Sequence, residues 1–454
     1  MRILLAAHQF FPEHYAGVET VTLSLAQEFD RRGHEVHVLA PKRSIPGSGI
    51  EPGEVEDYEF GGIPVRRVGR PKEGVSRPYR LDYDNEVMAM RTREYLREVR
   101  PDVVHAEHFQ GLSASVIPAI KESGAPLVYT ATDFWTFCPV VDLRRHDGAM
   151  CRGPEISHCT RCIASRYPGT RMKQAVDLTP PAALKVAGAL SETRLSGLSH
   201  QLRQVRALKR RPAYIREQME LVDRVIVYTR LMRELLLANG IGDGKIEVSH
   251  YGIDTSGITR APADRPYAPP LRVGFVGTLA PHKGCDVLIR AFRNLPAGLD
   301  ATLEVHGNLE RFKPFVGELR GLAEGDGRIN FAGPFSREDV GRVLSGLDVL
   351  VVPSRWYENG PGVIFEAFAA GIPVVATDLG GMSEFVRPEE DGLLFELENP
   401  QDLARQLRRL AEEPGLLRKL RTGIRPVKTV QENVDELEDL YDRLLGADPS
   451  GGGR

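Results

Sequence analysis

Short, continuous apolar runs alternate with amphipathic stretches along most of the chain. In the first half the apolar runs are RILLAA, EVHVLA, DVVHA and PLVYT, and in the second half they are LRVGFVG, ATLEVHG, RINFAG, DVLVVP and PVVAT. Stretches with a helical period, such as ETVTLSLAQEFDRRG and GVIFEAFAAG, lie between them. Apolar strands alternating with helices predict parallel sheets covered on both faces. We therefore expect an α/β protein with two doubly wound, Rossmann-like domains facing a central cleft.

Composition divides this pattern into domains. The stretch DTSGITRAPADRPYAPP, residues 254–270, is rich in Pro, Ala and small polar residues, which is typical of a linker. A last helix, TVQENVDELEDLYDRLL, follows a shorter link and has its apolar positions on one face. The predicted parts are a first domain at 1–260, with a Cys-rich loop at 138–162 and a helical insert at 166–220, a second domain at 271–422, and a final helix at 429–446.

Length and charge exclude some classes of protein. The chain has 454 residues, 42% of them hydrophobic and 27% charged, as in ordinary globular proteins. A net charge of -3 gives no reason to expect nucleic acid as a partner. No apolar run approaches the roughly 20 residues of a membrane helix, and the start has no cleavage pattern of a signal peptide. Five cysteines without a secretion signal indicate a cytoplasmic protein.

One basic stretch leaves two interpretations open. Its residues are Arg203, Arg206, Lys209, Arg210 and Arg211. A solvated helix face is the favoured interpretation. The alternative is peripheral contact with an anionic membrane surface, which an acceptor attached to a lipid would require.

The segment ENGPGVIFE carries the strongest chemical signal. After the run LDVLVVP the chain turns through SRWYENGPG and enters a helix. Pro361 suits the first helical turn, and Gly360 and Gly362 let a ligand approach the backbone closely. The N–H groups of Gly362, Val363 and Ile364 then face outward at a positive helix end, which is an arrangement that binds phosphate.

Two carboxylates flank this turn. Glu366 lies four residues after Gly362 on the same helix face, where a buried carboxylate requires hydroxyl donors such as those of a ribose. Glu358 precedes the helix and can accept hydroxyls from a sugar beyond the phosphates. The alternative is that Glu366 caps or pairs locally and that Glu358 is a solvated loop residue. One Glu pair does not decide between these interpretations.

Two further turns favour the ligand-binding interpretation. Lys283-Gly284 lies in a turn between a strand and a helix, where the lysine can neutralise a diphosphate. Gly380-Gly381 follows the strand PVVAT. Neither the Walker pattern nor the dinucleotide fingerprint is present. Phosphate donors, a cation and hydroxyl acceptors at one sheet edge together predict a nucleotide-sugar site.

With these motifs in this order, the chain resembles the retaining glycosyltransferases of family four, which have the GT-B fold, and within it a Cys-containing subgroup. The Glu-x7-Glu signature of that group falls on Glu358 and Glu366. The resemblance implies that the first domain lies on the acceptor side, that the second binds the nucleotide sugar, and that the final helix crosses back to the first domain.

The resemblance also implies roles for individual residues. Glu358 would contact the donor sugar, Glu366 the ribose and Lys283 the diphosphate. The glycine loop of the family corresponds to Ala16-Gly17, where Ala16 replaces a usual Gly. The implied donor-binding residues are Gly17, Thr278, Lys283, Glu358, Asn359, Gly360, Pro361, Gly362, Val363 and Glu366.

Two positions depart from the family pattern. Thr278 stands where many members carry an Arg, which leaves the phosphate charge to Lys283 and the helix ends. Thr132 stands where many members carry a His, before Asp133. Asp133 or His108 is expected to serve in its place, so the implied catalytic residues are Glu358, Lys283, Asp133 and His108. A structural role at a strand end is the alternative for His105 and His108.

Four cysteines form a separate group. Cys138, Cys151, Cys159 and Cys162 have the spacing C-x12-C-x7-C-x2-C and can supply a structural zinc site without an open position. Loop disulfides and buried free thiols are the alternatives.

The expected activity is metal-independent transfer of a sugar, with retention, from a UDP- or GDP-sugar to a glycan or lipid-linked acceptor in glycan, lipopolysaccharide or exopolysaccharide synthesis. No cofactor is expected for catalysis. The alternatives are a non-catalytic nucleotide-sugar-binding protein and a nucleotide-sugar epimerase of the same fold.

Overall fold

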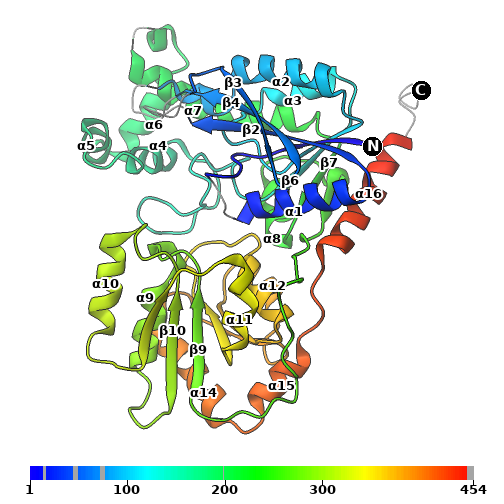
Figure 1. Ribbon diagram of the computed structural model, residues 1–454. Coiled ribbons are helices and arrows are strands. Elements are labelled where there is room, and N and C mark those ends of the chain that lie inside the picture. The colour runs from blue at the N-terminus through cyan, green and yellow to red at the C-terminus, as the bar shows by residue number, and fades with distance from the viewer. Residues whose placement is uncertain (14–16, 44–49, 72–76, 198, 447–454) are drawn as a thin grey trace. The chain divides into compact units, whose positions relative to one another are not determined.

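A computed structural model describes residues 1–13, 17–43, 50–71, 77–197 and 199–446. The chain forms two compact units (Figure 1). The first comprises Met1–Tyr251 together with the C-terminal segment from Val430, and the second comprises Gly252–Thr429. The sequence placed the change between domains within 254–270, whereas the structure places it between Tyr251 and Gly252.

The first unit contains an eight-stranded sheet. All neighbouring strands are parallel except for an antiparallel hairpin at one edge. Across the sheet the strands are β3 (Val55–Phe60), β4 (Ile63–Arg70), β2 (Glu35–Arg43), β1 (Arg2–Ala6), β5 (Val103–Ala106), β6 (Leu127–Ala131), β7 (Arg224–Val227) and β8 (Ile246–Val248). The predicted strands β1, β2, β5 and β6 are confirmed, and the hairpin β3–β4 and the strands β7 and β8 were not predicted.

Most helices of the first unit lie near this sheet, whereas three of the helices after β6 lie to one side of it (Figure 1). The helices of this unit are α1 (Gly17–Arg31), α2 (Glu86–Val99), α3 (Val116–Glu122), α4 (Ile156–Ser165), α5 (Arg171–Leu178), α6 (Pro181–Leu190), α7 (His200–Met219), α8 (Arg230–Ala238) and α16 (Val430–Gly446), with short 3-10 turns η1 (Tyr79–Asp82), η2 (Arg194–Gly197) and η3 (Asp243–Lys245). The last helix, α16, buries Val434, Leu437 and Tyr441 in the same core as Leu25 and Phe29 of α1, which confirms its predicted apolar face.

Two predictions for the segment after β6 are corrected. The Cys-rich loop is not a loop throughout, because Cys159 and Cys162 lie on α4. The helical insert is confirmed as α5, α6 and α7, but the basic stretch on α7 does not share one solvated face. Arg203, Lys209 and Arg210 are exposed, whereas Arg211 is only 2% exposed.

The second unit is built on a six-stranded, fully parallel sheet. Its strand order is β11 (Ile329–Gly333), β10 (Ala301–His306), β9 (Leu271–Val276), β12 (Val349–Val352), β13 (Val374–Thr377) and β14 (Gly392–Phe395). The five strands predicted from apolar runs are confirmed, and the sheet has the extra edge strand β14.

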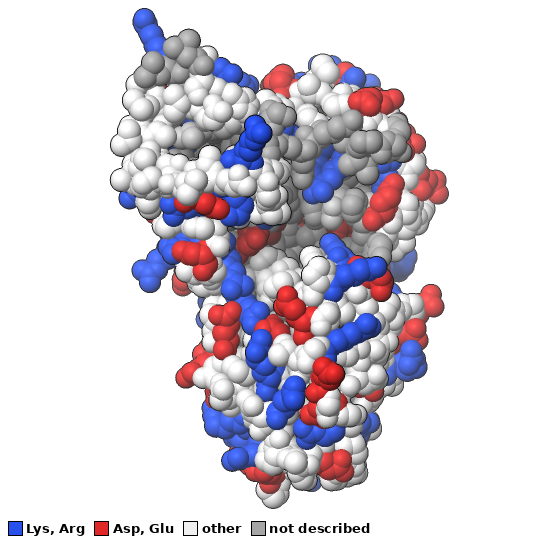
Figure 2. Space-filling view, turned by 90° about the vertical axis from the view of Figure 1, so that its left-hand side faces the viewer, with Lys and Arg blue, Asp and Glu red and all other residues white. Residues whose placement is uncertain are grey.

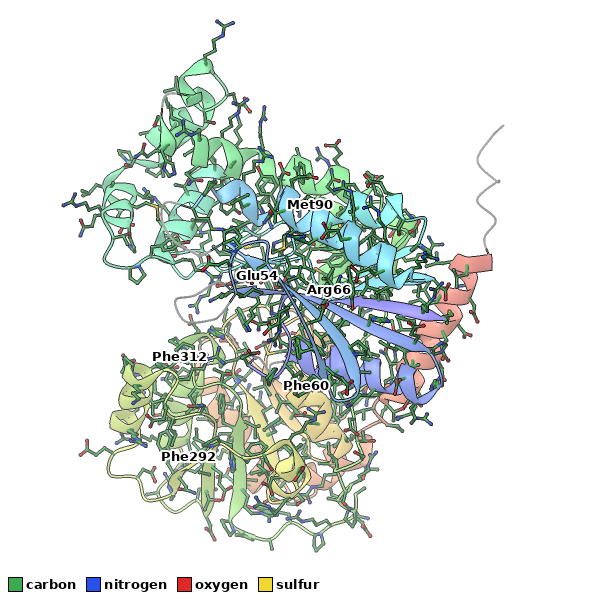
Figure 3. The ribbon with its side chains drawn as sticks, turned by 45° about the horizontal axis from the view of Figure 1, so that its top comes forward. Glu54, Phe60, Arg66, Met90, Phe292 and Phe312 are labelled. Carbon is green, nitrogen blue, oxygen red and sulfur yellow. The ribbon has the colours of Figure 1, made fainter. Side chains whose placement is uncertain are left out.

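Helices follow these strands in alternation. They are α9 (Cys285–Arg293), α10 (Lys313–Ala323), α11 (Val340–Ser345), α12 (Gly362–Ala369), α13 (Gly381–Phe385), α14 (Pro400–Glu412) and α15 (Leu416–Gly423), with 3-10 turns η4 (Pro281–Lys283) and η5 (Arg337–Asp339). One apolar core, which includes Phe292 of α9, lies under α9, α10 and α14 (Figure 3). A second lies under α12 and includes Ile364 and Phe368.

The length and polarity of the helices show whether any of them could cross a membrane. Among the described residues, no helix combines the length and the apolar character that crossing a bilayer requires.

Candidate functional site

In the second unit, two loops leave neighbouring strands at the same edge of the sheet. β9 and β12 are paired in parallel, so the loop 277–284 after β9 and the loop 353–361 after β12 start side by side. The carboxyl edge of a parallel sheet is where doubly wound domains bind ligands. The positions Thr278 and Lys283 lie in the first loop, and Asn359, Gly360 and Pro361 lie in the second.

Gly284 holds the two loops together. It has a φ of 70°, and a Cβ atom there would lie 1.9 Å from the carbonyl oxygen of Pro353, so no other residue fits. The N–H of Arg355 donates to the carbonyl of His282 at 2.8 Å, and its Nη2 donates to Asp286 at 2.6 Å. The position of the lysine turn is therefore fixed against the Glu-containing loop.

Glu358 is the centre of this arrangement. Its side chain is nearly buried, and its Oε1 accepts hydrogen bonds from Lys283 Nζ at 2.6 Å, Ser354 Oγ at 2.7 Å and Trp356 Nε1 at 2.8 Å. Burial opposes the ionised form, but Lys283 and the two neutral donors outweigh burial and hold the pKa of Glu358 below its ordinary value. Glu358 is therefore a carboxylate and Lys283 is its cation.

The structure brings together Glu358 and Lys283, for which the sequence predicted separate contacts with a ligand. It also adds Ser354 and Trp356, whose roles the sequence reasoning missed. The only signal for them was their place in the same loop, four and two residues before Glu358. The indole of Trp356 also lies beside Lys283, with Nζ 5.4 Å from the ring centroid, and its centroid is 4.3 Å from that of the His282 ring, with the two rings tilted by 43°.

The N-terminus of α12 differs in one detail from the prediction. Pro361 is the residue before the helix, and Gly362 is the first helical residue. The N–H of Ile364 donates to the carbonyl of Pro361 at 2.9 Å, so it is not available to a ligand. The N–H groups of Gly362 and Val363 have no acceptor within the described ranges, as expected at the start of a helix.

Glu366 lies on α12 one turn beyond these N–H groups. It is half-buried between Phe365 and Ala367, and its carboxylate accepts no hydrogen bond from any residue that the structure describes. Burial raises the pKa of Glu366, while the charge of Arg337 acts in the opposite direction. The oxygens of this carboxylate can therefore still accept a hydrogen bond from a hydroxyl outside the chain.

In the first unit, His108 and Asp133 form a pair at the ends of β5 and β6. His108 Nε2 lies 2.6 Å from Asp133 Oδ2. The N–H of Gln110 donates to His108 Nδ1 at 2.8 Å, so Nδ1 carries no proton and Nε2–H donates to the carboxylate. His108 is buried, whereas the Asp133 side chain is 29% exposed. Asp133 is therefore the member that a ligand can reach.

The glycine position of this unit lies at the start of α1. Gly17 is the first residue of the helix, and a side chain there would meet no atom within 4 Å. Ala16 lies outside the described residues. Two positions on, Glu19 is fully buried, and its Oε1 lies 3.3 Å from His8 Nε2. The ring of His8 is 4.7 Å from that of His108, so β1, α1 and β5 meet at this edge.

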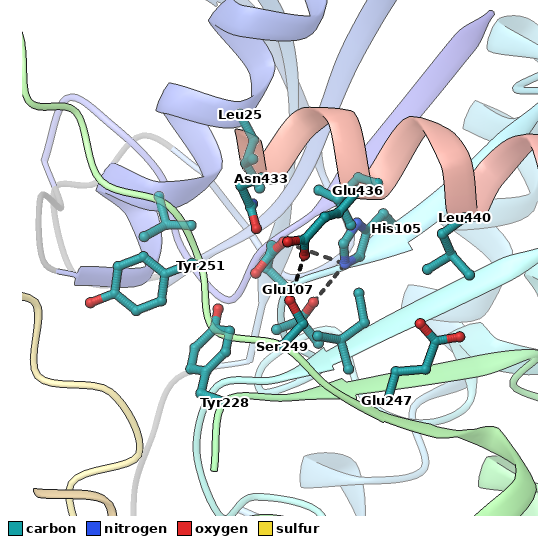
Figure 4. Close-up of a pocket in the computed structure, with 14 residues that line it drawn as sticks. Leu25, His105, Glu107, Tyr228, Glu247, Ser249, Tyr251, Asn433, Glu436 and Leu440 are labelled. Carbon is teal, nitrogen blue, oxygen red and sulfur yellow. Dashed lines mark hydrogen bonds and ion pairs between the residues drawn. The ribbon is translucent and has the colours of Figure 1, made fainter. Parts of the chain in front are cut away.

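His105 has a structural role. Its Nδ1 lies 2.6 Å from the hydroxyl of Tyr441 and its Nε2 lies 2.7 Å from that of Thr130, so it ties α16 to the sheet. Glu107 lies beside it in a cavity of about 40 Å³ that also contains Ser249 and Glu436 (Figure 4). Burial lowers the pKa of His105 to about 3 and raises the pKa of Glu107 to about 8. Both groups are therefore neutral at neutral pH.

The four cysteines are free thiols that line one cavity of about 10 Å³. Burial raises the pKa of Cys159 to about 12 and that of Cys162 to about 11. Throughout the described segments, however, no three His, Cys, Asp or Glu side chains are arranged to hold a metal ion. The thiols converge without forming a metal-binding geometry, and zinc binding stays a prediction.

Comparison with known proteins covers both units. The family described as glycosyl transferases group 1 matches residues 270–413. A D-inositol 3-phosphate glycosyltransferase of Mycolicibacterium gilvum is 32% identical over 241 residues, which cover 49% of this chain and 52% of that protein. A protein of the same name from Streptomyces bingchenggensis is 31% identical over 222 residues, covering 41% and 47%. The chain thus spans about half the length of these curated relatives.

Solved structures with low identity share the fold over the whole chain. Anabaena HepE in complex with UDP matches with a TM-score of 0.64 at 18% identity, covering 97% of this chain and 100% of that one. A sucrose-phosphate synthase of Thermosynechococcus elongatus matches with a TM-score of 0.63 at 17% identity, covering 98% and 100%. These matches show the predicted GT-B fold with its two parallel-sheet domains.

A second family description covers the first unit. The glycosyl transferase 4-like domain matches residues 16–252, which is more than half of the chain. The protein therefore belongs to the glycosyl transferase 4-like family.

Proposed function

We propose that this protein is a glycosyltransferase that moves a sugar from a nucleoside-diphosphate sugar to an acceptor hydroxyl. The observation that carries the proposal is the pair formed by Lys283 and Glu358 beside the N-terminus of α12. Family membership supports it, as do relatives named D-inositol 3-phosphate glycosyltransferase and the fold shared with HepE, whose structures hold UDP and UDP-glucose.

The donor contacts follow from the chemistry of each group. Lys283 and the N–H groups of Gly362 and Val363 bind the diphosphate and stabilise the negative charge that develops as it leaves. Glu358 already has three donors on Oε1, so its Oε2 accepts the hydroxyls of the donor sugar. Glu366 accepts the ribose hydroxyls. Asn359, Gly360 and Pro361 shape the loop, and Gly17 and Thr278 approach the phosphates.

On the acceptor side, Asp133 is the group that orients the reacting hydroxyl. His108 acts through Asp133 and is therefore a positioning residue. Its neutral ring donates one hydrogen bond that fixes the carboxylate, while the N–H of Trp135 fixes the other oxygen at 2.8 Å.

The proposal includes retention of configuration and no metal ion at the diphosphate. Lys283 and the helix N-terminus supply the positive charge that a metal ion supplies in other enzymes. Retention is supported by the Glu-x7-Glu resemblance alone. Analysis of the product anomer, and turnover in the presence of a chelator, test these two statements.

The acceptor is proposed to be a glycan or a lipid-linked molecule at the inner face of the membrane. Helix α6 supports membrane contact, because Ala182, Val186 and Leu190 form an exposed apolar face. In Figure 2 the upper-left part of the first unit is a largely uncharged surface with Lys and Arg at its edges. The exposed Arg203 and Arg210 of α7 add positive charge suited to anionic lipids.

Zinc binding by Cys138, Cys151, Cys159 and Cys162 is also proposed, as a structural rather than a catalytic site. Its support is the convergence of the four thiols on one cavity. The expected result is one zinc per chain by metal analysis of the purified protein, with loss of the metal in Cys159→Ser. Wild-type protein purified without zinc would contradict the assignment.

A donor screen tests the activity. Binding of UDP-, GDP- and ADP-sugars identifies the donor, and slow hydrolysis of that donor is then compared between wild type and Glu358→Gln. We expect Glu358→Gln to lower hydrolysis about 100-fold, because an amide accepts sugar hydroxyls more weakly than a carboxylate. Glu310→Gln, an exposed carboxylate of the same unit, is the matched control.

The same screen separates the alternatives. Donor binding without turnover, even with acceptor extracts present, would indicate a non-catalytic binding protein. Release of an epimerised nucleotide sugar without acceptor would indicate an epimerase. Hydrolysis that is equal in wild type and Glu358→Gln would remove the proposed site.

A further inference from the structure

A second polar cavity lies entirely within the first unit. It has a volume of about 340 Å³ and is enclosed by the ends of β2 and β4, the turn η1, the segment after β6, and helices α4 and α7. Its charged lining consists of five arginines and one aspartate: Arg43, Arg70, Arg77, Arg166, Arg211 and Asp82. Because the whole chain carries a net charge of -3, this concentration of positive charge is local.

The acids nearest the cavity are paired with arginines other than Arg211. Asp82 forms an ion pair with Arg77. Asp142 forms an ion pair with Arg166, half of whose side chain remains exposed to solvent. Neither acid is therefore the counter-charge of Arg211.

Arg211 is the residue that most requires an anion. It lies on α7, is 2% exposed, and is among the largest fully buried side chains of the protein. Its guanidinium donates to the carbonyl oxygen of Trp135 and lies 5.2 Å from the indole centroid. No carboxylate in the described part of the chain pairs with Arg211, and its Nε has no acceptor there. A buried cation without a counter-charge is strongly unfavourable, and a bound anion would offset that cost.

A second unsatisfied donor lines the same cavity. The hydroxyl of Tyr79 is buried and has no partner among the residues described. Buried donors without acceptors are rare in folded proteins and require an explanation. An oxyanion with several acceptor oxygens, such as a phosphate, can accept from a guanidinium and a hydroxyl at once.

The cavity adjoins the proposed acceptor side of the active site. Trp135 lines it, and the backbone N–H of Trp135 donates to Asp133. Gln110 also lines it, and the backbone N–H of Gln110 donates to His108. A molecule anchored in the cavity would thus extend along the residues that hold the His108–Asp133 pair.

We infer that this arginine-lined cavity binds a phosphate group of the acceptor, so that the protein glycosylates a phosphorylated acceptor. That the bound molecule is an acceptor rests on the proposed function. The anion site itself depends only on the geometry of the cavity. The phosphate can belong to a soluble sugar or polyol phosphate or to a lipid headgroup, because both present the same oxygens to the arginines.

Calorimetry with inorganic phosphate and with glucose 6-phosphate tests the site, in the presence of saturating UDP so that any diphosphate site is filled. We expect binding by wild type and at least about tenfold weaker binding by Arg211→Gln, since a charge-assisted hydrogen bond is lost. Arg166→Gln, whose side chain is half-exposed, provides a second test that does not depend on a buried substitution. Arg216→Gln, an exposed arginine of the same helix, is the control and should bind as wild type does.

Vesicles distinguish the two sources of the phosphate. Phosphatidylcholine vesicles containing phosphatidylglycerol should displace glucose 6-phosphate if the natural ligand is a lipid headgroup, and pure phosphatidylcholine vesicles should not. Absence of displacement assigns a soluble phosphate. Equal phosphate affinity in wild type, Arg211→Gln and Arg166→Gln, or no binding by wild type, would overturn the inference.

The outcome is separable from that of the donor screen. Arginine-dependent phosphate binding in a protein that turns over no nucleotide sugar would retain the anion site and reject the glycosyltransferase. Donor hydrolysis together with phosphate binding that does not depend on the arginines would retain the glycosyltransferase and reject the anion site.

Discussion

The two units place opposite kinds of charge at the carboxyl edges of their sheets. In the second unit the buried acid Glu358 is held by Lys283 and two neutral donors, so acid and cation balance each other within 2.6 Å. In the first unit the buried cation Arg211 has only a carbonyl oxygen and an indole ring, and among the described residues it has no acid. The acid of that edge, Asp133, is instead held by a neutral histidine.

This difference indicates what each unit lacks before a ligand binds. In the second unit Glu358 and Lys283 already balance each other, so a diphosphate bound at the proposed donor site would share Lys283 with Glu358. In the first unit Arg211 has no acid among the described residues, and an anionic ligand at the proposed cavity would supply one. Substitutions that remove one partner should therefore have different consequences in the two units.

The largest effect is expected for Lys283→Ala. Loss of the cation removes charge stabilisation of the leaving diphosphate, and donor hydrolysis should fall about 1000-fold. Lys313→Ala, an exposed lysine of the same unit, should leave hydrolysis unchanged. Comparable rates in Lys283→Ala and wild type, with the fold intact by circular dichroism, would show that the balanced pair is structural rather than catalytic.

A smaller effect is expected for Asp133→Asn in the first unit. Sugar transfer to acceptor should fall about 100-fold, because the carboxylate that orients the hydroxyl is lost, while donor affinity stays unchanged. His108→Gln should lower transfer less, since the histidine acts through Asp133. Asp147→Asn, an exposed residue of the same unit, is the control. Weakened donor binding in Asp133→Asn would place this residue on the donor side.

The smallest effect concerns stability. Glu107 has a folded pKa of about 8 against an ordinary 4.5. Between pH 6.5 and 8 the folded protein therefore retains a proton that the unfolded chain has released, so the free energy of unfolding falls as pH rises. His105 has a folded pKa of about 3 and an ordinary value of 6.5, so at pH 6.5 half of the unfolded chains still carry its proton. Loss of that proton as the pH rises gives a smaller change of opposite sign, about 0.4 kcal/mol. The expected loss is up to about 2 kcal/mol.

Denaturant unfolding at pH 6.5 and 8 measures this slope of the free energy of unfolding against pH, and Glu107→Gln should remove it. Glu247→Gln, which changes a more exposed carboxylate lining the same cavity, should retain it. A slope that persists in Glu107→Gln would show that another group of the first unit titrates there.

Much of the fold could be predicted because its strands are continuous apolar runs. RILLAA and LRVGFVG are buried at the centre of parallel sheets, and burial on both faces leaves an unmistakable pattern. The hairpin β3–β4 was missed because charged side chains such as Glu56 and Arg66 interrupt its apolar residues. The strand β7, RVIV, was missed because it follows directly on a stretch with a helical pattern, and β8 has only three residues, which is too short for a periodic signal.

The site was predicted in part. Glu358, Lys283 and the glycine turns were recognisable because their chemistry is local to each loop. The bond between Glu358 and Lys283, the support from Ser354 and Trp356, and the burial of His108 were not predictable, because each depends on how separate segments meet. Two adjacent arginines of α7 are an example, because Arg210 is exposed and Arg211 is buried.

The sequence by itself determined the alternating α/β order, the division into two units and the loops that carry the lysine, glycine and carboxylate groups, since apolar periodicity and turn chemistry are local properties. Only the tertiary structure decided which charges are balanced. Lys283 meets Glu358 across 75 positions of sequence, and Arg211 meets Trp135 across 76. Burial and distance between such segments set the electrostatics, and neither is encoded in the neighbourhood of a single residue.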